Sequence, residues 1–299
     1  MYIFVSGLIE KYLFNIYFFI SFIRSVVISN LKIYFIIKKN KLNNFSYKKL
    51  ISKKKSSKLF ILGCGSSIND LTDENWQEIK KNDTLGINRW ILHEHVPNFL
   101  LFEGAKKSDL AQGETRNSFI YDVLNQSNYR YRNSLFLVKS LDSLYINFKK
   151  LISIYDRIIP IYKLIPPGKS YLSAKKSIQI FKKYKILNSI SFPLGDRGTI
   201  THAISLALNM GYEEIILCGI DLNGPYFWEN NHSNLLFKPQ ELEEGEKNNE
   251  IHITNVKEDN NVTVEEVISL IKDNSMKINQ SIFVSSKKSV LSKLFKVYW

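Results

Sequence analysis

The amino-acid sequence predicts an α/β fold: a Rossmann-like, mostly parallel sheet with helices on both faces, plus a lid segment and an N-terminal membrane-associated helical arm. Short apolar runs alternate with helical patterns after residue 58, which is typical of parallel strands joined by helices. Several of these runs end in glycine or a polar residue, at the end of a strand where such sheets bind ligands. The first 57 residues differ in composition, being apolar and then rich in lysine.

The basic residues are unevenly spread along the chain. The 299 residues have a formal net charge of +13, and residues 1–58 contain twelve of the basic residues but a single acid, Glu10. The rest of the chain is therefore nearly neutral, which argues against a general nucleic-acid-binding surface. The two cysteines, Cys64 and Cys218, offer neither a metal-ligand spacing nor a disulfide framework, and we expect both to be small buried residues.

The arm, residues 1–57, has an aromatic and apolar run over 12–23 and a second apolar stretch over 26–37. Arg24 and Lys32 interrupt them, so neither reaches the roughly 18 uncharged apolar residues of a typical spanning helix. Aromatic residues followed by lysines favour a helix that lies on an anionic membrane surface. If the helix spans instead, the lysines after it stay cytoplasmic. A helix packed on the protein's own core, or on a second subunit of a homo-oligomer, is the other interpretation.

The body, residues 58–299, opens with short apolar runs that predict buried strands. A polar segment over 70–81 has a helical pattern and separates the first two runs. The runs cover residues 59–62, 84–87, 99–102, 135–138 and 158–161.

The clearest unit is a helix followed by a strand. The apolar residues within 199–210 fall on one face of a helix. Gly211 then provides a stop signal before a strand over 214–218. Regular patterning then fails over 222–261, a length typical of a functional lid. Thr263 and Glu266 form a capping box that opens another helix, and 281–284 predicts a last strand. The basic and aromatic tail after residue 290 either touches the membrane or docks as a helix.

Candidate binding residues follow the predicted strands, because ligands of parallel sheets bind beyond the carboxyl ends of the strands. Glycines allow close approach of the backbone to a phosphate, an amide can read a base or ribose, and an arginine can hold an anion. Simpler roles stay open: a tight turn for the glycines and for Asn88, a helix cap for Thr199 and a loop-ordering carboxylate for Asp221. The candidates are Gly63, Gly65, Ser66, Ser67, Asn88, Arg197, Thr199, Gly219 and Asp221.

The predicted lid contains Tyr226, His232 and His252. A histidine in a polar loop is suited to general-base chemistry, although a histidine in such a loop is more often a plain surface residue. No Asp-x-Asp pair occurs in the chain, and His93 and His95 lack the spacing of a zinc motif. We therefore expect neither a metal ion nor another cofactor.

Four segments resemble the bacterial sialyltransferases of glycosyltransferase family 42 and a related group of polysaccharide-biosynthesis proteins. The segments are 61–67, 86–89, 197–201 and 211–221, and the last, which reads Gly-Tyr-Glu-Glu-Ile-Ile-Leu-Cys-Gly-Ile-Asp, is the most specific. The resemblance covers roughly residues 58–290 in order, with a poor match over 105–190.

This resemblance implies a metal-independent, inverting transfer from a CMP-sugar, with sialic acid or a related acidic nonulosonate as the sugar. The acceptor would be a lipopolysaccharide or capsule glycan, at the cytoplasmic face of the bacterial inner membrane, and attachment would be peripheral or by a single anchor. The glycine loop, Asn88 and the Thr199 region would contact CMP, Tyr226 would hold the phosphate, and a lid histidine would deprotonate the acceptor.

The sequence departs from the family pattern in two places. Asn223 stands where the family has the first of two phosphate-binding tyrosines, and His252 lies ahead of the family's histidine position. Two alternatives therefore stay open: a transferase of the same fold with a different nucleotide-sugar donor, and a non-catalytic, membrane-attached nucleotide-binding protein.

Overall fold

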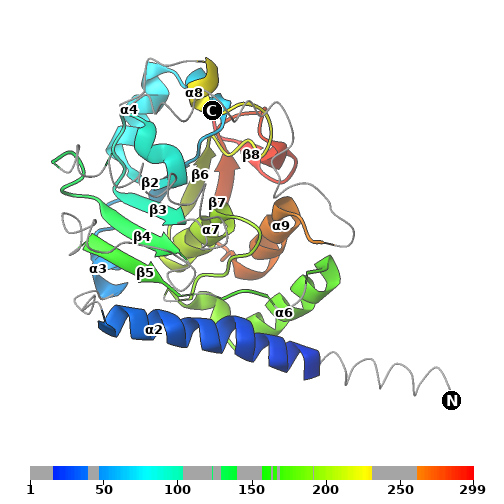
Figure 1. Cartoon of the computed structure of the whole chain (residues 1–299). Coiled ribbons are helices and arrows are strands. Elements are labelled where there is room, and N and C mark those ends of the chain that lie inside the picture. Colours follow the sequence, from blue (N-terminus) through cyan, green and yellow to red (C-terminus); the bar gives the residue numbers. More distant parts are fainter. Residues whose placement is uncertain are drawn as a thin grey trace.

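A computed structural model describes residues 16–39, 47–103, 123, 129–139, 157–162, 164–166, 169–190, 192–230 and 261–299. Its centre is an eight-stranded sheet in the order β5-β4-β3-β2-β1-β6-β7-β8, and every strand pair is parallel (Figure 1). The strands are β1 (Lys58–Leu62), β2 (Asp83–Ile87), β3 (Phe99–Glu103), β4 (Leu135–Lys139), β5 (Ile158–Ile161), β6 (Glu214–Cys218), β7 (Ser281–Val284) and β8 (Lys296–Val297).

Helices cover both faces of this sheet, as predicted. Side chains alternate along β1, so that Leu59 and Ile61 enter one apolar cluster while Phe60 and Leu62 enter the other. The first cluster includes residues of α6 (Tyr171–Lys183), α7 (Thr199–Asn209) and α9 (Val264–Ser275). The second includes residues of α4 (Asp73–Lys81), α8 (Phe227–Asn230) and the 3₁₀ segments η2 (Ser66–Asp70) and η3 (Asn88–Leu92).

Helix ends follow local capping chemistry. The predicted capping box of Thr263 and Glu266 opens α9, and Thr72 with Asn75 opens α4 in the same way. The tail does not form the docked helix that was one expectation, and its contact with the membrane, the other expectation, stays a prediction. It forms a 3₁₀ turn, η9 (Val290–Lys293), and then β8, which pairs with β7 at the edge of the sheet.

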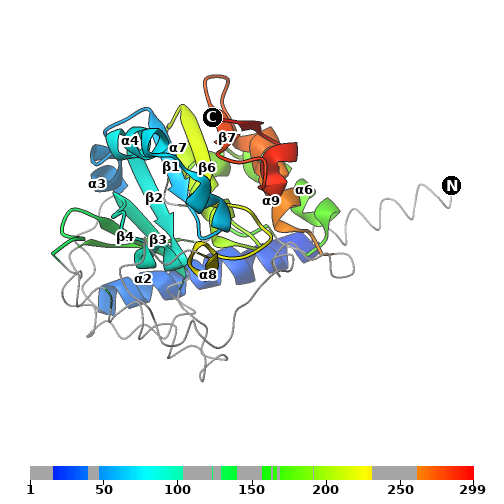
Figure 2. The same cartoon turned by 90° about the horizontal axis from the view of Figure 1, so that it is seen from above.

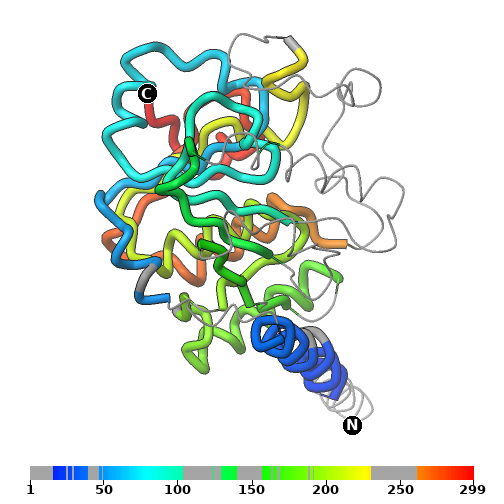
Figure 3. Tube along the Cα trace, turned by 60° about the vertical axis from the view of Figure 1, so that its left-hand side comes forward, coloured from blue at the N-terminus to red at the C-terminus, as the bar shows by residue number. Residues whose placement is uncertain are grey.

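The arm is packed on the body along one of its faces. A helix runs from Ile16 to Lys39, with a π-helical stretch η1 (Ile23–Ile28) before α2 (Ser29–Lys39), and α3 (Tyr47–Ser52) follows. Figures 1 and 3 show this helix beside β5 and α6. The rings of Phe18 and Phe22 lie 6.2 and 6.0 Å from that of Phe181 on α6. Packing on the protein's own core, one of the alternatives from the sequence, is thus observed.

The same helix is long and apolar enough to cross a membrane, by length and composition alone. The sequence favoured two separate, shorter runs because Arg24 and Lys32 interrupt them. Both charged side chains are exposed, so the helix continues through each without burying a charge.

Candidate functional site

The loops that follow β1 and β6 are joined by backbone hydrogen bonds at the carboxyl ends of these neighbouring strands, which are labelled in Figure 2. The backbone N–H of Gly65 donates to the carbonyl of Gly219 at 2.8 Å, and that of Ser66 donates to Pro225 at 3.0 Å. A Cβ atom on Gly63 or Gly65 would lie 2.5 or 2.9 Å from the Gly219 carbonyl oxygen. These glycines therefore allow the two loops to approach each other, and their predicted contact with a phosphate stays a prediction.

The Asp221 side chain joins the two loops through Ser67. Its carboxylate accepts hydrogen bonds from the Ser67 hydroxyl at 2.6 Å and from the Ser67 backbone N–H at 3.0 Å. Burial raises the pKa of Asp221, while the bonds from Ser67 act in the opposite direction. The observed contacts are those of a loop-ordering carboxylate, one of the two roles considered from the sequence.

A second group of polar residues gathers at the ends of β2, β3 and β4 and the start of α7. We call Asn88, Glu103, Lys139 and Thr199 the strand-end network. The Thr199 hydroxyl lies 3.4 Å from the Asn88 amide nitrogen and donates to Glu103 at 3.2 Å. Lys139 forms an ion pair with the same Glu103 oxygen at 2.8 Å, and the Glu103 backbone N–H donates to the Asn88 side chain at 3.1 Å. Four separate segments are thus joined at one edge.

Burial differs sharply across the Glu103–Lys139 pair. The Lys139 side chain is only 10% exposed, whereas that of Glu103 is 34% exposed. In the described part of the chain, the bonds to Lys139 and Thr199 engage one oxygen of Glu103, Oε2. Glu103 is therefore the member of this pair with surface available to a bound molecule.

Left-handed backbone marks the same edge. Among the described residues, four that are not glycine have a positive φ, and three of them follow a strand or precede α7: Asn88 (51°), Arg197 (65°) and Leu222 (59°). This conformation costs free energy for residues with a Cβ atom and clusters at functional sites. The fourth, Lys185, follows α6. Within the described part of the chain, the carboxyl edge thus holds most of the non-glycine residues with left-handed backbone.

The start of α7 differs from the sequence interpretation in one respect. Gly198, and not Thr199, is the N-cap residue, so the Thr199 hydroxyl is available to the strand-end network. The Arg197 Nε donates to the carbonyl of Val262 at 2.5 Å, which ties this turn to the segment before α9. Burial raises the pKa of the neighbouring Asp196, whose carboxylate accepts from the Arg197 backbone N–H.

The first residues of the predicted lid are ordered against the glycine loop. Tyr226 forms a backbone bridge with Gly65, and its ring stacks on Trp228 at 4.5 Å. The sequence predicted irregular structure here, but a short helix, α8, begins at Phe227, whose side chain is buried in the core. Asn223 is exposed. His232 and His252 lie outside the described residues, so their role as a base stays a prediction.

Glu103 and Lys139 were missing from the sequence analysis. Each is the last residue of an otherwise apolar strand, and each predicted strand ended one residue too early. A charged residue that closes a buried parallel strand is the signal that could have identified both, because strand ends of this kind face the ligand edge.

His93 and His95 lie in an aromatic cluster with Trp90, on the face of the sheet to which Phe60 and Leu62 point. The His93 ring stacks on Trp90 at 4.3 Å and on Trp76 at 5.2 Å. Burial lowers the pKa of His93 to about 3, with a smaller contribution from His95. Burial also disfavours the charged form of both cysteines, and it raises the pKa of the Cys64 and Cys218 thiols to about 12. These shifts favour the uncharged form of the imidazole and of both thiols.

Comparisons with known proteins show a distant likeness among solved structures. No protein-family model matches the chain, and no curated protein matches it. Among solved structures, the chain is similar to the monofunctional alpha-2,3-sialyltransferase Cst-I from Campylobacter jejuni, with 16% sequence identity over 82% of each chain and a TM-score of 0.39. At these values the likeness concerns the general course of the chain alone.

Proposed function

We propose that this protein is a glycosyltransferase that uses a CMP-sugar donor. The sugar would be sialic acid or a related acidic nonulosonate, and the acceptor a lipopolysaccharide or capsule glycan at the cytoplasmic face of the bacterial inner membrane. The observation that supports this most is the gathering of four motif segments, distant in sequence, at one carboxyl edge. Asn88, Thr199 and the glycine loop come from different segments and share that edge.

The strand-end network has the groups that a nucleotide needs. The Asn88 amide can both donate and accept, and the Thr199 hydroxyl lies at the N-terminus of the 11-residue helix α7, which favours an anion such as a phosphate. Lys139 and Arg197 add positive charge at the same edge. The open side of Glu103 can accept hydrogen bonds from hydroxyl or amino groups of the donor.

In the proposed reaction, the acceptor hydroxyl oxygen attacks the anomeric carbon from the side opposite the phosphate. The new carbon–oxygen bond forms as the bond to the phosphate oxygen breaks, and that electron pair leaves with CMP. The acceptor proton passes to His252 or His232, and Tyr226 stabilises the departing phosphate. Loss of a positioned base typically slows turnover by about 10² to 10⁴. Parallel assays of His252→Ala and His232→Ala identify which histidine is the base. Full activity of both variants would exclude a lid histidine as the base.

Nucleotide binding gives the primary test. Calorimetry of the full chain should show that CMP binds more tightly than UMP or GDP. Thr199→Val should weaken CMP binding by about tenfold, as expected for one lost hydrogen bond to a bound ligand. Asn209→Ala is the matched control, because Asn209 lies at the other end of the same helix and bonds to Ser189. Equal loss in both variants would contradict a nucleotide site at the helix start.

Turnover separates the remaining alternatives. Release of CMP from a CMP-sugar in the presence of EDTA would support the proposal, because a monophosphate leaving group needs less charge neutralisation than a diphosphate. Preference for UMP or GDP, with activity that depends on magnesium or manganese, would favour a different donor. Tight CMP binding without turnover on any acceptor would favour a non-catalytic nucleotide-binding protein.

A further inference from the structure

The outer face of the arm helix carries more than half of the exposed large apolar side chains in the described residues. Of the seventeen large apolar side chains exposed in the described residues, ten lie on the helix Ile16–Lys39, each 36–64% exposed. Contiguous apolar patches on soluble proteins are normally small, and larger ones mark an interaction surface. We call these residues the outer face; it includes Phe19, Ile20, Val27, Leu31, Tyr34 and Phe35.

The opposite side of this helix is already occupied by the protein. Val26 and Ile33 are 6% and 0% exposed, and Phe18 and Phe22 contact Phe181. Val26 belongs to the apolar cluster on one face of the sheet and Ile33 to the cluster on the other. The helix therefore crosses the β5 edge of the sheet and closes it. Lipid could surround the helix completely only if these contacts were broken.

Charge along the helix indicates what covers the outer face. Residues 16–39 contain Arg24, Lys32, Lys38 and Lys39 and no acid. Arg24 and Lys32 are exposed within the apolar run, where a spanning helix would place both in hydrocarbon at high cost. On a membrane surface their long side chains reach the headgroup phosphates. Exposed lysines after the helix, Lys48 and Lys53 among them, add to the attraction for anionic lipid.

We propose that the protein binds an anionic phospholipid bilayer monotopically: the helix Ile16–Lys39 lies in the membrane plane, its inner face on β5 and α6 and its outer face in the headgroup region. The body then sits on one leaflet without a spanning segment. This proposal does not depend on the glycosyltransferase assignment, because it uses none of the residues at the carboxyl edge.

Vesicle flotation of the full chain tests the proposal. The protein should float with vesicles of phosphatidylcholine and phosphatidylglycerol, less with phosphatidylcholine alone, and less again at high salt. The double variant Phe19→Glu/Phe35→Glu should lose at least about tenfold in the bound fraction, because it places two carboxylates in the apolar layer. Failure of the unmodified chain to float with anionic vesicles would overturn the proposal.

The matched control is Leu172→Glu/Tyr184→Glu, on and just after α6. These side chains are 67% and 66% exposed, against 62% and 64% for Phe19 and Phe35, so both double variants add the same charge at equally exposed positions. The control should float like the unmodified chain, and both variants should keep its thermal unfolding temperature. Equal loss of flotation in both would overturn the assignment to the outer face.

Two further measurements separate the in-plane arrangement from its competitors. Alkaline carbonate should release the vesicle-bound protein, since no segment crosses the bilayer, and retention would overturn the monotopic arrangement. Sedimentation without lipid should give the same mass for the unmodified chain and for Phe19→Glu/Phe35→Glu. A dimer that only the outer-face variant disrupts, in a protein that ignores vesicles, would show that a second copy covers this face.

Discussion

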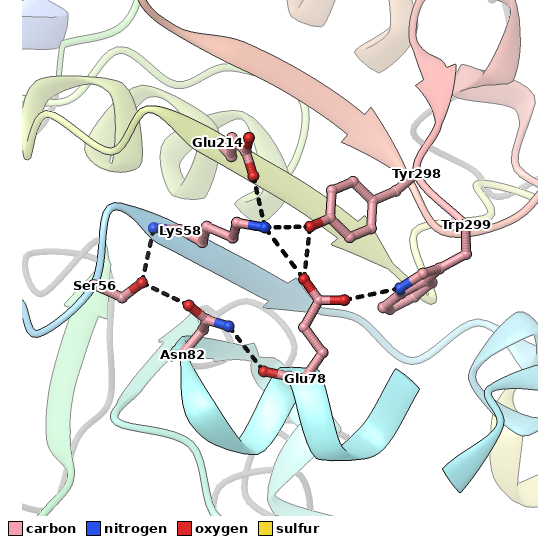
Figure 4. Close-up of polar contacts among 7 residues, drawn as sticks. All are labelled: Ser56, Lys58, Glu78, Asn82, Glu214, Tyr298 and Trp299. Atoms are coloured by element: carbon pink, nitrogen blue, oxygen red, sulfur yellow. Dashed lines mark hydrogen bonds and ion pairs between the residues drawn. The ribbon is translucent and has the colours of Figure 1, made fainter. Parts of the chain in front are cut away.

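The Tyr298 hydroxyl lies 2.6 Å from the Lys58 ammonium nitrogen and 2.7 Å from the Glu78 carboxylate, so the segment after β8 is fastened to the start of β1 (Figure 4). Lys58 also pairs with Glu214 at 3.0 Å, and Trp299 donates to Glu78 at 3.1 Å. The bond with Tyr298 raises the pKa of Lys58 above its usual value. Three elements and the last residues of the sequence thus share one polar cluster.

Removal of one hydroxyl tests this cluster. Tyr298→Phe should lower the free energy of unfolding by about 1 to 2 kcal/mol, because it removes the bonds to Lys58 and Glu78 but keeps the ring that packs on Phe60 and Phe283. Urea unfolding measures the change. Tyr184→Phe, whose ring is exposed, should leave stability unchanged. Equal stability of Tyr298→Phe and the unmodified chain would show that the cluster contributes nothing.

A glycine substitution tests the closeness of the two loops at the carboxyl edge. Gly65→Ala should destabilise the protein by several kcal/mol or prevent folding, since its Cβ would lie 2.3 Å from the Asp221 carboxylate oxygen. Gly198→Ala is the matched change, because its Cβ would meet nothing closer than Val264 at 3.4 Å. Thermal unfolding compares the two. Similar unfolding temperatures would contradict the loop contact described above.

The Glu103–Lys139 ion pair of the strand-end network should affect nucleotide binding. Lys139→Met removes a positive charge beside the proposed phosphate site. Glu103→Gln replaces a negatively charged carboxylate, a hydrogen-bond acceptor, with a neutral amide. Each should weaken CMP binding by about tenfold or more, as for a lost hydrogen bond to a charged group. Lys288→Gln, which breaks the exposed pair with Asp70, should leave affinity unchanged. If calorimetry finds that Glu103→Gln binds CMP more tightly, Glu103 serves only as the counter-ion of Lys139 and does not contact the nucleotide.

His93 should make the protein sensitive to mild acid. Its folded pKa is about 3, whereas an unfolded histidine titrates near 6.5, so the unfolded state binds more protons between these pH values. The free energy of unfolding should therefore fall as pH drops from about 6.5 toward 3, by at most about 1.4 kcal/mol per pH unit for this group. His93→Phe keeps a ring stacked on Trp90 and Trp76 and should reduce the slope in urea unfolding, while His95, whose pKa burial lowers to about 4, still contributes. An unchanged slope would contradict this assignment.

Much of the sheet could be predicted because its strands are buried on both faces and so appear as continuous apolar runs. The strands over 158–161, 214–218 and 281–284 have the predicted limits, and the capping box of α9 is present. The strand β8 could not be found this way. It has two residues and depends on its pairing with Phe283 and Val284, which no local pattern encodes.

The site was only partly predictable for a related reason. Loop positions after β1, β2 and β6 are marked by glycine or by polar residues, and these are at the expected edge. Which of them bond to one another depends on the tertiary fold. Asp221 proved to order Ser67, and Thr199 proved to bond to Glu103, a residue that reads as an ordinary charged residue after an apolar run.

The arm helix also has a consequence for the order of events during synthesis. Phe18 and Phe22 precede their partner Phe181 by about 160 residues. At about 5–20 residues per second, this gap corresponds to roughly 10 to 30 s of translation. During that interval Phe18 and Phe22 lack this partner, and a bilayer is an apolar phase that can receive them. A nascent chain that reaches the membrane first would complete its sheet there, so delivery to the membrane would come before folding.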